Sequence, residues 1–230
     1  MGSSSITYNA DCLVAMKAMP DKCFDLAVVD PPYGIGESGE KNHTRGKFAV
    51  SKDYKPFAGR DREPPPPEYF TELARVSKNR VIFGANHFID RLPNPASSCW
   101  IVWDKENGAT DFADCELAYT SFRSAVRIFR FRWQGMLQGD MKNKEIRIHP
   151  TQKPVALYRW IFQNYAKPGD KILDTHLGSG SSRIAAYDAG LDFVGYEIDP
   201  DYYAAQERRF EQHTAQLTLF DLPEFAGGGD

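Results

Sequence analysis

A carboxylate, two prolines and a tyrosine follow one another in the segment Asp30-Pro31-Pro32-Tyr33. The segment comes directly after residues 24–29, a short apolar run that predicts a buried parallel strand. Each proline fixes φ and removes a backbone donor, so the turn is stiff and its carbonyl oxygens stay free. The Asp30 carboxylate and the Pro31 carbonyl can accept both N–H bonds of an exocyclic amino group, while an exposed Tyr33 stacks on the ring. A proline-stiffened turn capped by Asp30 is the alternative interpretation.

A second stretch that can do chemistry lies nearer the carboxyl end. Residues 171–174 predict a strand that runs into a Gly-x-Gly turn at Gly178 and Gly180, followed by an alanine-rich helix. Such a turn brings backbone N–H groups to a ligand at a helix N-terminus. The next predicted strand ends in Glu197, about twenty residues on, where a carboxylate can bind both ribose hydroxyls. We expect an adenosine-bearing cofactor, and the missing Gly-x-Gly-x-x-Gly fingerprint argues against NAD.

Residues 121–153 combine basic and aromatic side chains in an otherwise acidic chain. The alternation in residues 127–132 predicts a strand with one basic face, formed by Arg127, Arg130 and Arg132. Basic and aromatic surfaces suit phosphate contact and stacking on nucleobases, which predicts nucleic-acid binding here. Arginines that are merely solvated are the alternative. The predicted DNA-contacting residues, including two from a preceding loop, are Lys47, Lys52, Arg127, Arg130, Arg132, Lys142 and Lys144.

These segments need a scaffold in which strands and helices alternate. Strands are expected at residues 5–9, 24–29, 80–84, 100–104, 116–119, 171–174 and 193–197, and helices at 13–19, 68–77 and 155–165, with a last helix ending near Glu211. That order is typical of an open α/β sheet, whose ligands bind at the carboxyl ends of the strands. Residues 34–62 are polar, basic and aperiodic, which predicts a loop that is mobile without DNA and closes on it.

Composition limits the class of protein. A chain of 230 residues fits one large α/β domain, and its net charge of −3 means that any nucleic-acid site must be local. The four cysteines form no CxxC pair and predict reduced thiols. No apolar run approaches a membrane span, and the five histidines show no metal-ligand spacing, so no metal is expected. We expect a cytoplasmic protein, bacterial or phage-encoded.

Three motifs in one order resemble the beta group of DNA amino-methyltransferases, of the DPPY type. They are Asp30 to Tyr33, then residues 149–154 (His-Pro-Thr-Gln-Lys-Pro), then the loop from Asp174 to Ser182. The catalytic motif precedes the cofactor loop, with the basic segment between them, over roughly residues 6–210. The resemblance implies a Rossmann-like fold with a seven-stranded, mostly parallel sheet and a circularly permuted motif order. It also implies S-adenosyl-L-methionine as the cofactor and a flipped adenine in DNA as the target.

Residue roles follow from the same resemblance. Asp30, Pro31, Pro32 and Tyr33 are expected to be catalytic, with Asp30 also lying against the cofactor. The remaining expected cofactor-binding residues are Asp11, Cys12, Thr151, Lys153, Asp174, Leu177, Gly178, Ser179, Gly180, Ser181, Glu197 and Ile198. Asp11 and Cys12 would hold the adenine, Glu197 the ribose, and Thr151 with Lys153 the carboxylate end. One departure is His176, where the family usually has phenylalanine.

The expected activity is therefore adenine N6 methylation of double-stranded DNA. Cytosine N4 methylation uses the same geometry and stays open, but family members that begin with Asp are mostly adenine enzymes. A protein-glutamine or RNA methyltransferase and a catalytically silent DNA-binding module are further alternatives. The resemblance implies a homodimer, and it leaves open whether a restriction partner exists.

One boundary divides the chain. We expect a catalytic domain over residues 1–215, with a short target-recognition segment at about 121–148, and a tail over 216–230. The tail begins Gln216-Leu217-Thr218-Leu219-Phe220, which looks like the peptide by which bacterial replication and repair proteins bind the sliding clamp. Docking of these apolar residues on the protein itself, or fraying, is the alternative. The hypothesis is that this tail recruits the protein to a replication clamp.

Overall fold

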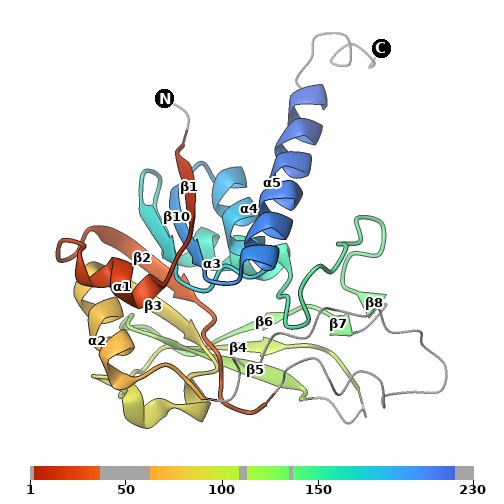
Figure 1. The fold of residues 1–230 in the computed structure, drawn as a ribbon. Coiled ribbons are helices and arrows are strands. Elements are labelled where there is room, and N and C mark those ends of the chain that lie inside the picture. Colours follow the sequence, from red (N-terminus) through yellow and green to blue (C-terminus); the bar gives the residue numbers. More distant parts are fainter. Residues whose placement is uncertain (1–2, 37–62, 109–112, 135–136, 221–230) are drawn as a thin grey trace.

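The computed structural model describes residues 3–36, 63–108, 113–134 and 137–220 (Figure 1). Its helices and strands are, in chain order, β1 (Ser5–Asn9), α1 (Cys12–Lys17), β2 (Phe24–Val29), α2 (Pro67–Val76), β3 (Ser77–Phe83), β4 (Trp100–Asp104), β5 (Cys115–Thr120), β6 (Arg127–Arg130), β7 (Trp133–Gln134), β8 (Leu137–Gln138), α3 (Val155–Tyr165), β9 (Lys171–Asp174), α4 (Ser181–Asp188), β10 (Asp192–Glu197) and α5 (Pro200–Phe220). The expected closing loop, with Lys47 and Lys52, falls largely on residues 37–62, outside this described part.

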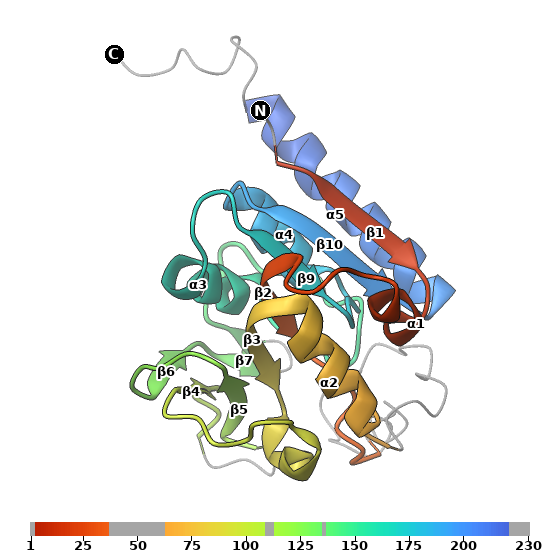
Figure 2. The ribbon, with the colours of Figure 1, turned by 90° about the vertical axis from the view of Figure 1, so that its left-hand side faces the viewer.

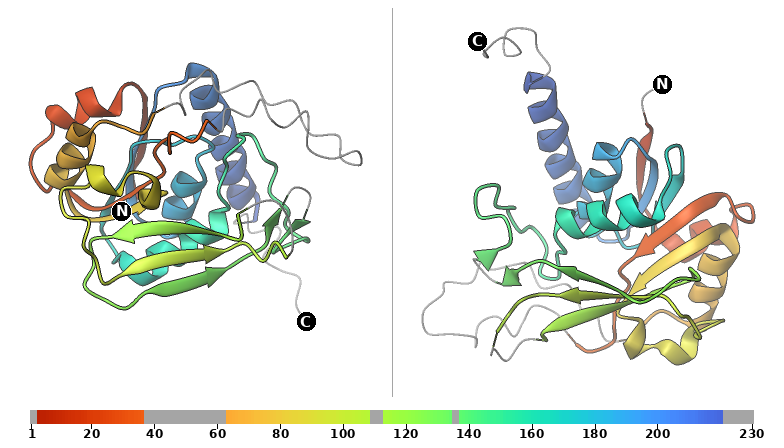
Figure 3. Two further views of the ribbon diagram at one scale, coloured as in Figure 1. Left: turned by 90° about the horizontal axis from the view of Figure 1, so that it is seen from below. Right: turned by 180° about the vertical axis from the view of Figure 1, so that it is seen from behind.

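The main sheet has eight described strands in the order β1-β10-β9-β2-β3-β5-β4-β6. Only β5 runs antiparallel to its neighbours among them, so the expected mostly parallel sheet is confirmed. The expected count of seven is one too low, because the basic segment adds β6 at the edge beside β4. Figure 3 shows β4, β5 and β6 side by side at this end of the sheet.

Alternating side chains of the strands divide the core into two layers. On β2, Leu26 and Val28 face one side, whereas Ala27 and Val29 face the other. The first side is covered by α3 and α4, through residues such as Leu157 and Ile184, and the second by α1 and α2. Helix α5 runs beside β1 at the opposite edge of the sheet from β6 (Figure 2). This is the doubly covered arrangement that parallel sheets require.

Strand order explains where a ligand can bind. β9 and β2 are parallel neighbours in the middle of the sheet, with β10 beyond one and β3 beyond the other. The chain therefore leaves β9 and β2 in opposite directions, which opens a crevice at their carboxyl ends. Asp30 follows β2 directly and residues 175–180 follow β9 directly, so the two motifs from distant parts of the sequence meet at this crevice.

Most predicted elements form, with shifted ends. The expected helix over 68–77 ends at Val76, because Ser77 already has extended dihedral angles and begins β3. The expected strand over 127–132 stops at Arg130. The last helix does not end near Glu211, since α5 continues to Phe220 and takes in the five residues assigned to the tail. Residues 221–230 lie outside the described part, and clamp binding stays a prediction.

None of the described helices is both long and apolar enough to span a bilayer.

Candidate functional site

A cavity of about 1540 Å³ opens at the carboxyl ends of β9, β2 and β10. It brings together nearly all of the residues expected from the sequence: Asp11, Cys12, Asp30, Pro31, Pro32, Tyr33, Thr151, Lys153, Leu177, Gly178, Ser179, Ser181, Glu197 and Ile198 all line it. Asp174 and Gly180 lie behind its surface. We refer to the part formed by Asp11, Cys12, residues 175–181 and Glu197 as the cofactor wall. The part formed by Asp30, Tyr33, Glu116 and Lys153 is the target wall.

Backbone geometry shapes the turn between β9 and α4. Gly178 and Gly180 have φ of +50° and +74°, a region that side chains other than glycine rarely adopt. Gly180 is the N-cap of α4 and has no side chain to cap the helix. The N-cap side chain therefore takes none of the first N–H groups of α4, and the helix dipole at this end favours a negative group.

Glu197 ties β10 to this turn. It is buried, and its carboxylate accepts hydrogen bonds from the backbone N–H of Gly178 at 2.8 Å and of Asp199 at 2.8 Å. These two bonds hold the carboxylate at the cavity surface, where its oxygens are suited to the hydroxyl groups of a ribose. Ile198, next in the chain and about half exposed, supplies an apolar surface beside it. These residues fit an adenosine group.

Asp11 and Cys12 lie at the start of helix α1 and line the cofactor wall. Asp11 is the N-cap, and its Oδ1 accepts from the backbone N–H of Leu13 at 2.8 Å. Burial raises the pKa of the Cys12 thiol to about 12, and the Asp11 carboxylate adds to the rise. Cys12 is therefore a neutral thiol at neutral pH, suited to packing against a flat heterocycle and not to nucleophilic attack.

Asp174 supports the turn from below the cavity. Its carboxylate accepts from the hydroxyl of Ser182 at 2.5 Å and from the backbone N–H of His176 at 3.0 Å. Burial raises the pKa of Asp174 to about 7. Burial also lowers the pKa of His176 to about 4, so this ring is neutral where it meets the Thr175 hydroxyl at 3.0 Å and the edge of Tyr69.

Ion pairs hold the side chains of the target wall in place. Lys153 Nζ lies 2.5 Å from Asp30 Oδ2 and 3.1 Å from Glu116 Oε2. The Tyr33 hydroxyl donates to Asp30 Oδ1 at 2.7 Å, and Lys153 donates to that hydroxyl at 3.0 Å. Lys105 Nζ adds a further ion pair to this cluster, at 2.5 Å from Glu116 Oε1. Both oxygens of Asp30 thus already have a protein partner.

Burial and the neighbouring charges have opposing effects on the pKa values of this cluster. For Asp30, burial raises the pKa, and the charge of Glu116 raises it further. Lys153 opposes both effects, but the pKa of Asp30 stays above its usual value. Burial would also raise the pKa of Glu116, but Lys153 and Lys105 outweigh it and lower the value to about 2. For Lys153, burial favours the neutral amine, and the two carboxylates reverse this and raise its pKa.

One sequence expectation changes here. Tyr33 was expected to be exposed, but its ring is half-buried and stacks on His87, with centroids 5.3 Å apart. Gly84 lies so close that a Cβ on it would meet the Tyr33 ring at 2.1 Å. Lys153 and Thr151 both line the cavity, where the Lys153 ammonium pairs with Asp30 and Glu116 and Thr151 contacts His149, whose pKa burial lowers to about 4. Their expected contact with the carboxylate end of the cofactor stays a prediction.

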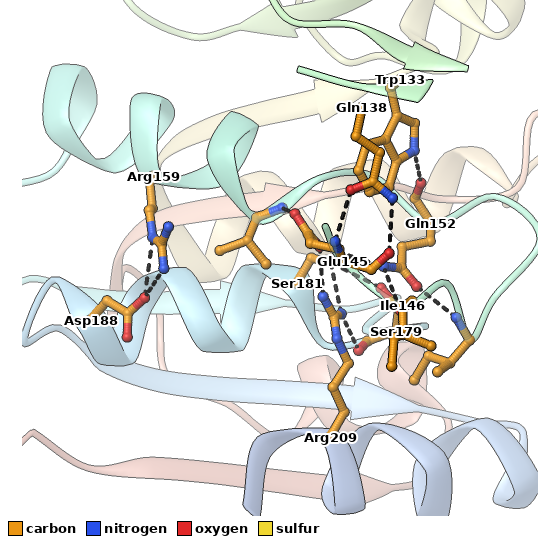
Figure 4. A network of polar contacts seen from close by, with 12 residues as sticks. Trp133, Gln138, Glu145, Ile146, Gln152, Arg159, Ser179, Ser181, Asp188 and Arg209 are labelled. Atoms are coloured by element: carbon orange, nitrogen blue, oxygen red, sulfur yellow. Dashed lines mark hydrogen bonds and ion pairs between the residues drawn. The ribbon is translucent and has the colours of Figure 1, made fainter. Parts of the chain in front are cut away.

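A polar network joins the basic segment to the cofactor wall (Figure 4). Glu145 accepts from the backbone N–H of Val155 at 2.8 Å and from Arg209 Nη2 at 2.7 Å. Arg209 Nη1 in turn donates to the carbonyl of Ser179 at 2.8 Å and to the hydroxyl of Ser181 at 2.9 Å. One arginine of α5 therefore fixes the cofactor turn and the segment that follows β8 at the same time.

The basic segment does not form one basic face. Successive side chains of a strand point to opposite sides, so Arg127 shares a side with Phe129 and lies opposite Arg130. Arg130 is 3.4 Å from Asp104, which neutralises part of its charge. Lys144 lines the cavity, whereas Arg132 and Lys142 are exposed outside it. The DNA-binding assignment of all these residues stays a prediction.

Sequence reasoning missed residues that line the cavity from elsewhere in the fold, namely Tyr69, His87, Lys105, Glu116 and Glu145. It also missed Arg209, which holds the turn at Ser179 and Ser181. Glu116 is on the antiparallel strand β5, opposite Trp103 of β4, and no neighbouring motif marks it. Arg209 is one of several charged residues on α5. The one available signal was the acidic position of Glu145 within a basic segment. Within the described residues, no group of three or more His, Cys, Asp or Glu side chains could hold a metal ion.

Comparison with known proteins supports the resemblance. The family model of the N6/N4 type with the description DNA methylase matches residues 122–208. The type II methyltransferase M.HinfI of Haemophilus influenzae is 23% identical over 248 residues, which cover 88% of this chain and 67% of that protein. The resemblance to DNA amino-methyltransferases expected from the sequence is thus confirmed.

Solved structures show the same fold. The M1.HpyAVI–SAM complex has a TM-score of 0.56 at 20% identity and covers 89% of this chain and 98% of its own. The cytosine-N4-specific PvuII DNA methyltransferase has a TM-score of 0.59 at 13% identity, and the match covers 94% of this chain and 92% of that chain. The expected α/β fold of S-adenosylmethionine-dependent DNA methyltransferases is confirmed, and the expected cofactor agrees with the first of these complexes.

Proposed function

We propose that this chain is an S-adenosylmethionine-dependent DNA methyltransferase that modifies the exocyclic N6 amino group of adenine. One observation carries the proposal: the Asp30 to Tyr33 motif and the Glu197 and glycine-turn site share one cavity. An acceptor for an amino group therefore faces a site suited to an adenosine-bearing methyl donor. A silent binding module would not need this juxtaposition.

The chemistry that the cofactor supplies is an activated methyl group. The amino nitrogen forms a bond to the methyl carbon as the carbon–sulfur bond breaks, sulfur keeps the electron pair, and nitrogen then loses a proton. Asp30 and the Pro31 carbonyl hold the amino hydrogens, which directs the nitrogen lone pair out of the ring and stabilises its developing positive charge. Alignment alone can lower such a barrier by ~7–11 kcal/mol. Asp30 is also placed to accept the proton and release it to solvent.

Adenine N6 is preferred over cytosine N4 because the motif begins with Asp30, and members of the resembling family that begin with Asp are mostly adenine enzymes. Cytosine N4 is the second candidate, since PvuII methyltransferase shares the fold. Both bases present an amino group beside a ring nitrogen, so the Asp30 geometry serves either one. Whether a restriction enzyme acts with this chain is a separate prediction.

DNA is proposed to approach over the basic segment, with Lys144 at the mouth of the cavity. The reacting base must leave the duplex to reach Asp30, at a cost of about a few kcal/mol. Exposed Arg132 and Lys142 are suited to phosphate contact, which positions the duplex without reading sequence. Removing one phosphate contact should lower the salt slope of log affinity by about 0.9.

The test is to incubate the purified chain with methyl-labelled S-adenosylmethionine and mixed-sequence duplex DNA, and then to digest the DNA to nucleosides. We expect N6-methyladenosine, as its deoxynucleoside, to carry the label. If N4-methylcytosine carried the label instead, the target base would be cytosine, and the reaction would still be methyl transfer to an exocyclic amino group of DNA. Cofactor binding by calorimetry with no labelled nucleoside from any DNA would favour the silent module. Sequencing methylated sites in DNA from expressing cells would then give the recognition sequence.

A further inference from the structure

The buried ammonium of Lys153 lies between two carboxylates, only one of which belongs to the expected catalytic motif. Its side chain is 4% exposed, and its Nζ contacts Asp30 at 2.5 Å and Glu116 at 3.1 Å. Burying an ammonium is costly unless it is paired and hydrogen-bonded. Lys153 therefore needs a carboxylate partner at every stage of a reaction cycle.

Glu116 reaches this position through the sheet. The inserted strand β5 runs antiparallel to β3 and β4, so its first residues lie beside the carboxyl ends of the parallel strands. Glu116 is opposite Trp103 in the β4 pairing, and Lys105, just past β4, holds its outer oxygen at 2.5 Å. The carboxylate is thus fixed from outside while its inner oxygen faces Lys153.

Asp30 cannot serve two buried partners equally well. Its Oδ2 is bound to Lys153 and its Oδ1 to the Tyr33 hydroxyl. A target amino group that binds Asp30 weakens the Asp30–Lys153 contact, and the positive charge that develops on nitrogen is repelled by the ammonium. Both effects are relieved if Lys153 moves toward Glu116, which is already within contact distance.

We propose that Glu116 is a positioning residue that holds Lys153 while the Asp30 carboxylate engages the target amino group. The inference rests on the proposed function and adds a charged partner outside the Asp30 to Tyr33 motif. With Asp30 and Glu116 ionised and Lys153 and Lys105 protonated, the four groups are neutral together next to the reacting nitrogen. Without Glu116 the remaining groups carry a net charge of +1, which opposes the positive charge that develops on nitrogen.

The experiment compares Glu116→Gln with the parent, and with Glu211→Gln as a matched change at an exposed position of α5. We expect the single-turnover rate of Glu116→Gln to fall by about tenfold to a hundredfold, below the loss typical of removing a direct donor. Affinities for cofactor and DNA should stay within about twofold, because Glu116 acts on the chemical step. Glu116→Asp should recover part of the rate, since it keeps the charge.

A pH profile separates positioning from general damage. The groups that face Asp30 are Lys153, Glu116, Tyr33, Tyr69, Tyr158 and Asp174. Among them Glu116 raises the pKa of Asp30, so its removal should move the acid limb of the rate profile to lower pH. A disturbed fold would lower the rate without this shift. An unshifted limb together with a rate within threefold of the parent would overturn the proposal.

Two further arms keep the result decisive. If Glu116→Gln does not fold, Lys105→Met removes the outer anchor of Glu116 instead, and a rate equal to the parent would overturn the proposal. If the parent itself transfers no methyl group to any DNA, the proposed function fails, and the role of Glu116 fails with it. If the parent and Glu116→Gln are both fully active, the positioning role of Glu116 is rejected and the proposed function stands.

Discussion

The cofactor wall is shaped mainly by backbone, whereas the target wall is shaped by side chains that hold one another through charge. Gly178 and Gly180 bend the turn after β9, and Glu197 fixes it by accepting a backbone N–H. The target wall joins Asp30, Glu116 and Lys153 from three separate parts of the sequence. A site made from backbone tolerates many side-chain changes, but a charged cluster fails when one member leaves its partner buried. The predictions below test this contrast.

The largest effect should follow Asp30→Ala, which removes the acceptor of the target amino group. We expect the single-turnover rate to fall by at least about a hundredfold, while cofactor affinity changes little because the cofactor wall is intact. Single-turnover transfer and calorimetric cofactor binding would measure the two effects, with Asp90→Ala as an exposed control. A rate within tenfold of the parent would remove Asp30 from the proposed role.

The next largest effect should follow Gly84→Ala, because the added methyl group would push against the Tyr33 ring and change the shape of the target wall. Gly84 has φ of +67°, and a Cβ there would meet the Tyr33 ring at 2.1 Å. Gly108 has nearly the same φ, +65°, with nothing within 4 Å of its Cβ position, so Gly108→Ala carries the backbone strain alone. We expect about 1 kcal/mol of destabilisation for Gly108→Ala and clearly more for Gly84→Ala.

Measurement of both stability and transfer distinguishes the two glycine variants. Urea denaturation gives the free energy of unfolding, and the transfer rate reports the position of Tyr33. Equal losses of stability in the two variants would mean that the Tyr33 ring moves aside at no cost. A normal transfer rate in folded Gly84→Ala would show that the packing of Tyr33 on this turn does not position it.

The same contrast explains what the sequence could predict. Asp30 to Tyr33 and residues 174–182 are continuous segments whose local geometry follows from prolines and glycines, so both were placed correctly at strand ends. Strand order brings Glu116 into the cavity, and helix packing brings Arg209 against the turn that lines it, and no spacing in the sequence predicts either contact. The assumed basic face failed for a simpler reason, since Arg127 and Arg130 are three positions apart and a strand places them on opposite sides.

A smaller effect is expected for Arg209→Gln, which tests whether the cofactor wall needs one side chain after all. Arg209 donates to the Ser179 carbonyl and the Ser181 hydroxyl and pairs with Glu145. Hydrogen bonds to charged groups contribute about 1.5–3 kcal/mol, so cofactor affinity should fall by about tenfold or somewhat more. Arg208→Gln, at the preceding exposed position, is the matched control. Unchanged affinity would leave the turn held by backbone alone.

The smallest effect at neutral pH should come from His176→Phe, which replaces a half-buried neutral ring by an apolar ring of similar shape. Burial lowers the pKa of His176 to about 4, so the unfolded chain, with a value near 6.5, binds the additional proton between these two pH values. The stability contributed by neutral His176 is therefore complete above about pH 6.5 and is lost as pH falls toward 4. Phenylalanine has no such proton.

The free energy of unfolding of His176→Phe should match that of the parent within about 1 kcal/mol at pH 7.5. At pH 5 it should exceed the parent's by about 1–3 kcal/mol, because only the parent must exclude a proton from the ring. Urea denaturation at the two pH values measures this difference. An equal offset at both would mean that His176 is charged or hydrated in the folded protein. The apolar cofactor wall would then be more open to water than its packing on Tyr69 indicates.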